Sequence, residues 1–174
     1  MADKIAINRC TNANVYMDGT SFMGKAEEVD LPVVKHKMSG HKALGMVGSP
    51  EFWAGIDKME AKIKWNSIYA EVAGRIADPF TAIQLQVRAS VETYGSQGRT
   101  LQVPMVCHLT GTFSEDSLGA FKQHEPVDLP STMSVTYIKQ VIDGEEGLEI
   151  DVMANIYKVG GVDLLAEYKA NIGG

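Results

Sequence analysis

The sequence has few cysteines and no long apolar stretch, and both shortages limit the kind of protein it encodes. Only two of its 174 residues are cysteine, Cys10 and Cys107. Two isolated thiols in a chain of this length do not form the disulfide framework of small secreted domains, so we expect both to be reduced. No run approaches the roughly 20 apolar residues of a membrane-spanning helix, and residues 1–10 lack the apolar centre of a secretion signal. We therefore expect one cytosolic domain spanning residues 1–174, with no membrane span.

Positive charge is also scarce. The chain has 16 Lys and Arg against 22 Asp and Glu, which gives a formal net charge of −6. Proteins that grip phosphate groups depend on Lys and Arg that displace counterions, so an acidic chain is poorly suited to bind nucleic acid. Lys58, Lys62 and Lys64 form a mostly basic face on a predicted strand. Without stacked aromatic side chains this is a weak signal for DNA contact, and we expect a face that is solvated or pairs with another subunit.

Residues arranged for chemistry are missing as well. The four histidines do not show the spacing of metal ligands, and there is no Cys-x-x-Cys pair. The serines lack the Gly-x-Ser-x-Gly elbow of a hydrolase, and the glycine-rich residues 45–49 lack the lysine of a phosphate-binding loop. The sequence therefore predicts no catalytic residue, no metal site and no cofactor, which favours a structural protein over an enzyme. The histidines are His36, His41, His108 and His124.

The sequence is rich in apolar and polar residues that alternate with a period of two. Successive side chains of a strand face opposite sides of the sheet, so this period predicts half-buried strands. Residues 58–65 alternate in this way, with Met59, Ala61, Ile63 and Trp65 on the apolar side. We expect this segment to be a strand that covers a core.

The same pattern predicts two long antiparallel hairpins. Each needs two alternating runs joined by a turn in which glycine supplies a positive φ. The expected hairpins are 81–93 with 101–109 across 95–99, and 132–142 with 148–159 across 143–147. Earlier in the chain we expect a strand at 13–17, a turn at Asp18-Gly19 and an extended run at 23–37, where Pro32 marks an edge or a bend.

Two helices complete the expected fold. Ile68, Val72 and Ile76 form a helical stripe, Ser67 can cap its first turn, and the helix should end before Asp78-Pro79. The second helix lies in the C-terminal segment, after a Gly-Gly break, and we expect its apolar face to pack on a sheet or on a neighbouring subunit. The predicted class is mainly β, an antiparallel sandwich or barrel with long hairpins, one flanking helix and a short C-terminal helix. The C-terminal packing residues are Leu164, Leu165, Tyr168 and Ile172.

One long stretch fits no element. Residues 41–55 contain several glycines and a proline, together with the exposed-looking Met46, Phe52 and Trp53. A long loop without secondary structure is usually functional or disordered, and aromatic residues argue against disorder. We interpret residues from about 38 to 56 as a loop that becomes ordered against a neighbouring subunit, with Met46, Phe52 and Trp53 as its contact candidates.

Several segments, in order along the chain, resemble the major tail tube proteins of contractile-tailed bacteriophages and R-type pyocins. The matching segments cover most of the chain, and the C-terminal block, with its Gly-Val-Asp-x-Leu-Ala and closing Ile-Gly, is the most specific. Residues 68–130 match in pattern only. The matches are residues 14–19, 22–24, 27–32, Gly45-Met46, Met59-Glu60 and 150–174.

The resemblance implies a structural subunit of the virion, made and assembled in the host bacterial cytoplasm. In that family six copies form a ring around a lumen, and the rings stack into a tube through which DNA passes without specific binding. The implied partners are further copies of the chain, a tail sheath protein around the tube, and baseplate and tail terminator proteins at its ends. An acidic or neutral polar lumen would keep DNA from adhering.

Two alternatives remain open at the level of sequence. The chain could form the tube of a related injection machine, a tailocin or a type VI secretion system, because the physics of a tube is shared. It could instead be a monomeric β-barrel that binds a small ligand, which predicts a closed barrel around an apolar pocket.

Overall fold

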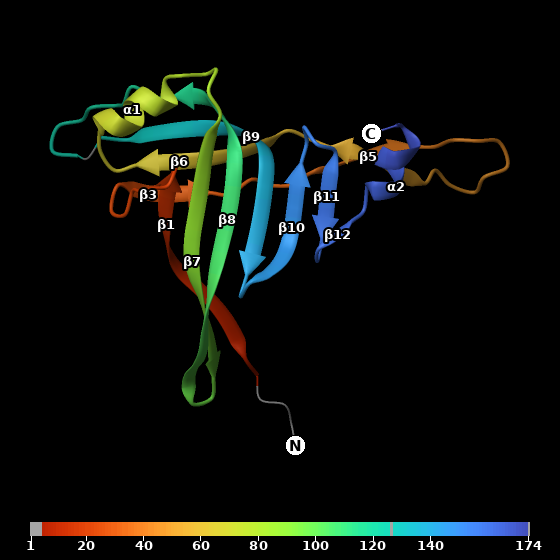
Figure 1. The fold of residues 1–174 in the computed structure, drawn as a ribbon, viewed down its shortest axis with the longest axis horizontal. Coiled ribbons are helices and arrows are strands. Elements are labelled where there is room, and N and C mark those ends of the chain that lie inside the picture. The colour runs from red at the N-terminus through yellow and green to blue at the C-terminus, as the bar shows by residue number, and fades with distance from the viewer. Residues whose placement is uncertain (1–4, 126, 174) are drawn as a thin grey trace.

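The computed structural model describes residues 5–125 and 127–173 and confirms the predicted fold class: strands dominate, every strand pair is antiparallel, and two short helices flank the sheet. Figure 1 shows the long strands at the centre, α1 (Ala70–Ile76) at one end and α2 (Ala166–Asn171) at the other. The strands are β1 (Ile7–Met17), β2 (Thr20–Ser21), β3 (Ala26–Asp30), β4 (His36–Gly40), β5 (Glu51–Ile56), β6 (Met59–Trp65), β7 (Ile83–Gly95), β8 (Gly98–Asp116), β9 (Leu129–Ile142), β10 (Glu145–Asp151), β11 (Ile156–Val159) and β12 (Val162–Asp163).

The main sheet branches at β9. Its order is β12-β11-β10-β9-β8-β7-β1-β2, and β6, with β3 beyond it, pairs with the first half of β9. Residues 129–135 of β9 pair with β6, whereas residues 137–142 pair with β10. Because two different strands share one edge of β9, the sheet divides there and its two branches enclose the core.

Both ends of this strand order are unpaired in the described part of the chain, as is the outer side of β3 in the other branch. β1 pairs with β7 along its length but meets β2 only at Tyr16 and Met17, so residues 7–13 have no strand on their outer side. At the opposite end, β12 pairs only with β11. Unpaired strand edges are templates for pairing with another chain.

The first predicted hairpin is confirmed, with a shorter turn than expected. β7 and β8 stay paired as far as Gly95 and Gly98, so the connection is only Ser96 and Gln97. The second hairpin is confirmed at β9 and β10, where Asp143 (φ 53°) and Gly144 (φ 81°) form the turn. Positive φ at both central residues suits the right-handed twist of the flanking strands.

The prediction of one strand over residues 148–159 is wrong. β10 ends at Asp151, and β11 begins at Ile156 after a turn. The Asp151 carboxylate accepts hydrogen bonds from the backbone N–H groups of Met153 and Ala154, both at 3.0 Å. An aspartate that binds the following N–H groups offers the backbone an alternative to the strand ladder, and this local competition ends β10.

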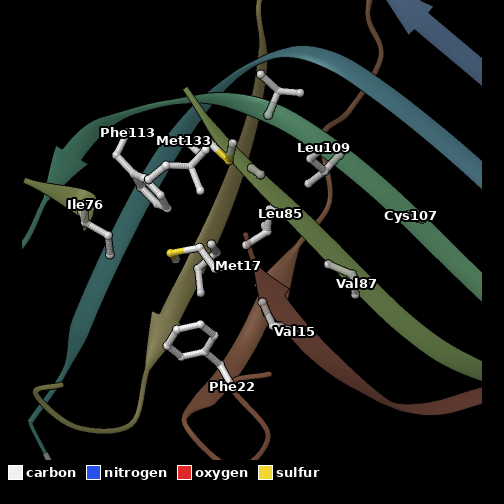
Figure 2. Packing of buried hydrophobic residues seen from close by; sticks show 14 of the residues in the cluster. Val15, Met17, Phe22, Ile76, Leu85, Val87, Cys107, Leu109, Phe113 and Met133 are labelled. Carbon is white, nitrogen blue, oxygen red and sulfur yellow. The ribbon is translucent and has the colours of Figure 1, made fainter. Parts of the chain in front are cut away.

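The core lies where the two branches of the sheet face each other. The predicted apolar side of β6 is buried along its whole length, from Met59 to Trp65. Figure 2 shows Met17, Leu85 and Met133 converging from different strands into this core. The interior between the branches is filled by these side chains.

Ser131 gives the core a buried hydrogen bond. Its side chain is 2% exposed, accepts from Trp65 Nε1 at 3.1 Å and donates to the Ile63 carbonyl at 3.3 Å. We expect Ser131→Ala to leave the indole N–H buried without an acceptor and to lower the free energy of unfolding by about 1–3 kcal/mol. Denaturant unfolding would measure this loss, with exposed Ser67→Ala as the control. Equal stability of the two variants would contradict the assignment.

α1 is shorter than the sequence predicted. Val72 and Ile76 are buried and the helix ends before Asp78-Pro79, as expected. The proposed cap at Ser67 is wrong because the helix begins at Ala70 behind Tyr69, which makes no side-chain cap hydrogen bond. Ile68 therefore lies outside the helix and is exposed.

The N-terminal third differs from expectation in length. β1 begins at Ile7 rather than at residue 13, and the turn at Asp18-Gly19 is confirmed. The predicted extended run over residues 23–37 is interrupted between β3 and β4, a gap that contains Pro32. Proline cannot donate to a strand ladder, which is consistent with a break at this point.

Candidate assembly surfaces

One side of the long strands faces the core, and the opposite side is a polar face. On this side, Arg88 Nε donates to the Gln86 side chain at 2.7 Å, and Gln86 Nε2 lies 3.2 Å from a ring nitrogen of His108. The Arg88 guanidinium lies 4.7 Å from the centre of the Tyr16 ring. The pKa of His108 is lowered, first by burial and then by the positive charges of Arg88 and Lys139, so the ring is neutral near pH 7.

Charges on the remainder of this polar face are paired. Glu149, whose side chain is 12% exposed, lies 3.0 Å from Lys158 and 3.6 Å from Lys139, and it accepts from the Tyr137 hydroxyl at 3.1 Å. The hydrogen bond from Lys158 is the main cause of the lowered pKa of Glu149. Lys139 also pairs with Glu146 at 2.5 Å, which raises the pKa of the lysine. The polar face is therefore rich in hydrogen-bonding groups but carries little unbalanced charge.

The lowered pKa of Glu149 predicts a pH-dependent contribution to stability. A carboxyl whose pKa falls on folding stabilises the folded state above its unfolded pKa, about 4.3 for Glu, and loses that effect as pH falls through the folded pKa. We expect Glu149→Gln to melt at a lower temperature than the wild type at pH 7, with the difference shrinking below pH 4. Glu125→Gln, in an exposed pair with Lys122, is the control and should match the wild type at every pH. A difference that stays constant with pH would exclude the charge as its cause.

Residues 36–56 form an arm that projects from the main sheet (Figure 1). The prediction that residues 41–55 contain no secondary structure is wrong, because β5 begins at Glu51 and pairs with β4 as a separate two-stranded sheet. Only residues 41–50 form a loop, which is closed by a hydrogen bond from His41 N–H to the Pro50 carbonyl at 2.9 Å. Neither strand shows the regular alternation of a half-buried strand, so periodicity does not predict this pairing.

The contact candidates Met46, Phe52 and Trp53 are all exposed on the arm. Their contact with another subunit stays a prediction. Two further candidates at the tip, Leu44 and Val47, were not predicted, and both are fully exposed in a single subunit. The signal that could have identified Leu44 and Val47 is that they are bulky apolar residues next to glycines in a long connection.

The base of the arm rests on the C-terminal segment. Trp53 Nε1 donates to His36 Nδ1 at 3.2 Å, and the His36 ring lies 6.1 Å from the Tyr157 ring. With Leu164 and Leu165 these residues line an apolar hollow of about 320 Å³. The hydrogen bond of Trp53 joins the two strands of the arm, and His36 and the shared hollow connect the base of the arm to the C-terminal segment. The Phe52 ring lies 6.4 Å from the His41 ring.

The four C-terminal packing residues are not buried together. Leu165 is half-buried, whereas Leu164, Tyr168 and Ile172 are exposed. Leu164 and Leu165 precede α2, which has only six residues, so the four side chains do not form one helical face on the sheet. Packing of this segment on a neighbouring subunit remains a prediction.

Lys58, which precedes β6, and Lys62 and Lys64 within β6 lie off the buried apolar side of the strand. Lys58 and Lys64 are compensated by carboxylates, whereas Lys62 forms no ion pair with the described residues. Lys58 lies 2.8 Å from Glu60, and Lys64 lies 3.4 Å from Glu27 and 3.6 Å from Asp128. The surface is consequently of mixed charge rather than basic.

Titratable and nucleophilic groups are dispersed. In residues 5–125 and 127–173 there is no group of three or more His, Cys, Asp or Glu side chains placed to hold a metal ion. Both cysteines are unpaired, Cys10 on the surface and Cys107 in the core, where burial raises the pKa of the thiol. None of the helices described is long and apolar enough to cross a membrane.

An antiparallel sheet with open edges and apolar projections is the architecture of a self-associating structural subunit.

Comparison with known proteins shows to which family of structural subunits the chain belongs. The chain belongs to the phage tail tube protein FII family, whose model matches residues 7–173. It is 30% identical over 166 residues to the tail tube protein of Escherichia phage P2, covering 92% of this chain and 94% of that protein. It is 26% identical over 152 residues to the major tail tube protein of Serratia phage KSP20, covering 86% of each chain. The resemblance found in the sequence is thus confirmed: the chain is a phage structural protein, a virion component of the tail tube.

Proposed function

We propose that residues 1–174 act as a single domain from which six copies form a ring, and that the rings stack into the hollow tube of a contractile tail. The observation that carries the proposal is the pair of unpaired sheet ends, β1 along residues 7–13 and β12. Pairing of these ends with neighbouring copies would satisfy their backbone groups and remove the edges that invite aggregation. A heterologous contact of this kind generates a ring when its rotation closes.

The polar face of the long strands is the proposed lining of the lumen. Most of its charged groups, among them Lys139 and Glu149, are paired with each other, and His108 is neutral, whereas Arg88 is bound to Gln86 and has no carboxylate partner among the described residues. A surface of paired charges offers DNA few free cations to bind. DNA would therefore slide along this surface without specific binding when the tail ejects the genome. The proposed partners are the tail sheath protein outside the tube and the baseplate and tail terminator proteins at its ends, with assembly in the host bacterial cytoplasm.

Negative-stain electron microscopy of the purified protein tests the proposal. We expect rings or tubes with a central hole, and end-on averages with six-fold symmetry. Another symmetry would contradict the hexamer but not the tube. A protein that remains strictly monomeric at high concentration, with neither rings nor tubes, would overturn the proposed function.

A further inference from the structure

A small apolar groove lies beneath α1, at the end of the molecule opposite the arm. Its floor consists of buried core residues, including Trp65, Val72 and Leu129, and the exposed Ile68 and Leu118 stand at its rim. Its volume is about 100 Å³, whereas pockets for small ligands enclose roughly 300–1,000 Å³. The groove therefore has the size of a socket for one side chain.

The tip of the arm carries side chains of a matching kind. Leu44 and Val47 are fully exposed on either side of Gly45 and Met46, on a loop that extends away from the core. Apolar groups held this far from their own core gain nothing from folding of the single subunit. Such groups mark a surface that is covered in an assembly.

The two surfaces also have complementary charge. Lys42 lies next to the apolar tip and Asp116 lines the groove. Neither forms an ion pair with the part of its own chain that the structure describes. Complementary charges at the edge of an apolar contact fix its orientation and register.

The groove and the arm tip lie at opposite ends of the long axis of the molecule (Figure 1). The tip therefore has no access to the groove of its own subunit. A contact between two different surfaces on identical copies is heterologous, and it continues from copy to copy until a ring closes or a filament forms.

We propose that the arm tip of one copy inserts into the groove beneath α1 of the next copy, with Leu44 in the apolar socket and Lys42 beside Asp116. This inference rests on the proposed function, since it requires that the chain assembles with itself. It adds the receiving surface for the arm, which includes Ile68 and Leu118.

Charge reversal tests the pairing. Lys42→Glu places two carboxylates together, and Asp116→Lys places two cations together, so each variant should raise the protein concentration needed for tube formation by about tenfold or more. The double variant restores opposite charges and should assemble near the wild-type concentration. Lys42→Glu with Glu28→Lys is the control, because it has the same net charge but changes an exposed carboxylate outside the groove. Equal recovery in the control and the double variant would overturn the pairing.

A mixing experiment tests the heterologous geometry. Leu44→Asp removes the apolar side chain that enters the groove, and Leu118→Asp places a charge at the rim of the groove. Both residues are exposed, so each variant should fold, and circular dichroism would verify this. Either variant alone should fail to form tubes. When they are mixed, the intact groove of one fits the intact arm of the other, and mass photometry should detect complexes of two units, whether subunits or rings. Tubes from both variants, or no new complex on mixing, would overturn the inference while wild-type tubes still support the proposed function. A monomeric wild type would overturn both.

Discussion

Replacement of Gly111 by alanine is expected to prevent the subunit from reaching a stable fold. Gly111 lies in β8 at an irregularity in its pairing with β9. A Cβ atom at this position would lie 1.9 Å from the Ser134 carbonyl oxygen and 2.9 Å from Val135 Cα. These are backbone atoms, so no change of rotamer relieves the clash and the two central strands would have to separate. We expect a loss of about 4 kcal/mol or more, which is comparable to the whole stability of a marginal domain.

The same substitution at a glycine of the adjacent strand β7 provides the control for Gly111→Ala. A Cβ atom at Gly95 would meet only the Thr100 methyl group, at 3.6 Å, an ordinary contact. We expect Gly95→Ala to be soluble and to unfold within about 0.5 kcal/mol of the wild type. Yield of soluble protein and thermal unfolding by circular dichroism measure both variants. A Gly111→Ala protein that melts at the wild-type temperature would show that the approach of β9 to β8 is looser than described.

Removal of the aromatic side chains of the arm is expected to abolish tube formation without unfolding the subunit. Phe52 (59% exposed) and Trp53 project from β5, and the core does not depend on either. Aromatic residues at the centre of an interface each contribute about 2 kcal/mol or more, which corresponds to roughly thirtyfold in affinity. The double variant Phe52→Ser and Trp53→Ser should therefore remain dispersed at concentrations that give wild-type tubes.

Sedimentation and electron microscopy would measure this loss, and circular dichroism would confirm that the sheet remains. Phe80→Ser is the matched control, because Phe80 is an exposed aromatic residue on the connection between α1 and β7. The single variants should differ in kind: Trp53→Ser also removes the hydrogen bond to His36 and loosens the base of the arm, whereas Phe52→Ser leaves that bond intact. Normal tubes from the double variant would show that Phe52 and Trp53 are not contact residues and would leave the tip of the arm as its only proposed contact.

The sequence predicted those elements whose pattern depends only on residues close to one another in the chain. The strand β6 and the long hairpin of β7 and β8 were found because a half-buried strand must alternate. The end of α1 followed from a proline that restricts the residue before it. The break between β10 and β11 was missed because Asp151 acts through hydrogen bonds to the N–H groups that follow it, an effect that the apolar pattern does not record.

The assembly surfaces were only partly predictable for a different reason. The arm was recognised as unusual from its aromatic residues, but the pairing of β4 with β5 was not, because neither strand covers a core. The groove beneath α1 was not predicted at all. Its floor includes Trp65 and Val72, which are seven residues apart, and Leu129, which is distant in the chain and is brought beside Trp65 only by the pairing of β6 with β9.

The order of residues alone indicates which side of each regular strand enters the core and carries the resemblance to tail tube proteins that the family comparison confirmed. It also shows no recognisable catalytic or metal motif. The tertiary structure decided which apolar residues stay outside the core. Leu164 and Ile172 were expected to pack on a sheet or on a neighbouring subunit, and within the single subunit they are exposed, as is Leu44 at the tip of the arm. The physical reason is that periodicity reports the face a side chain occupies, whereas burial depends on what the rest of the chain places opposite that face.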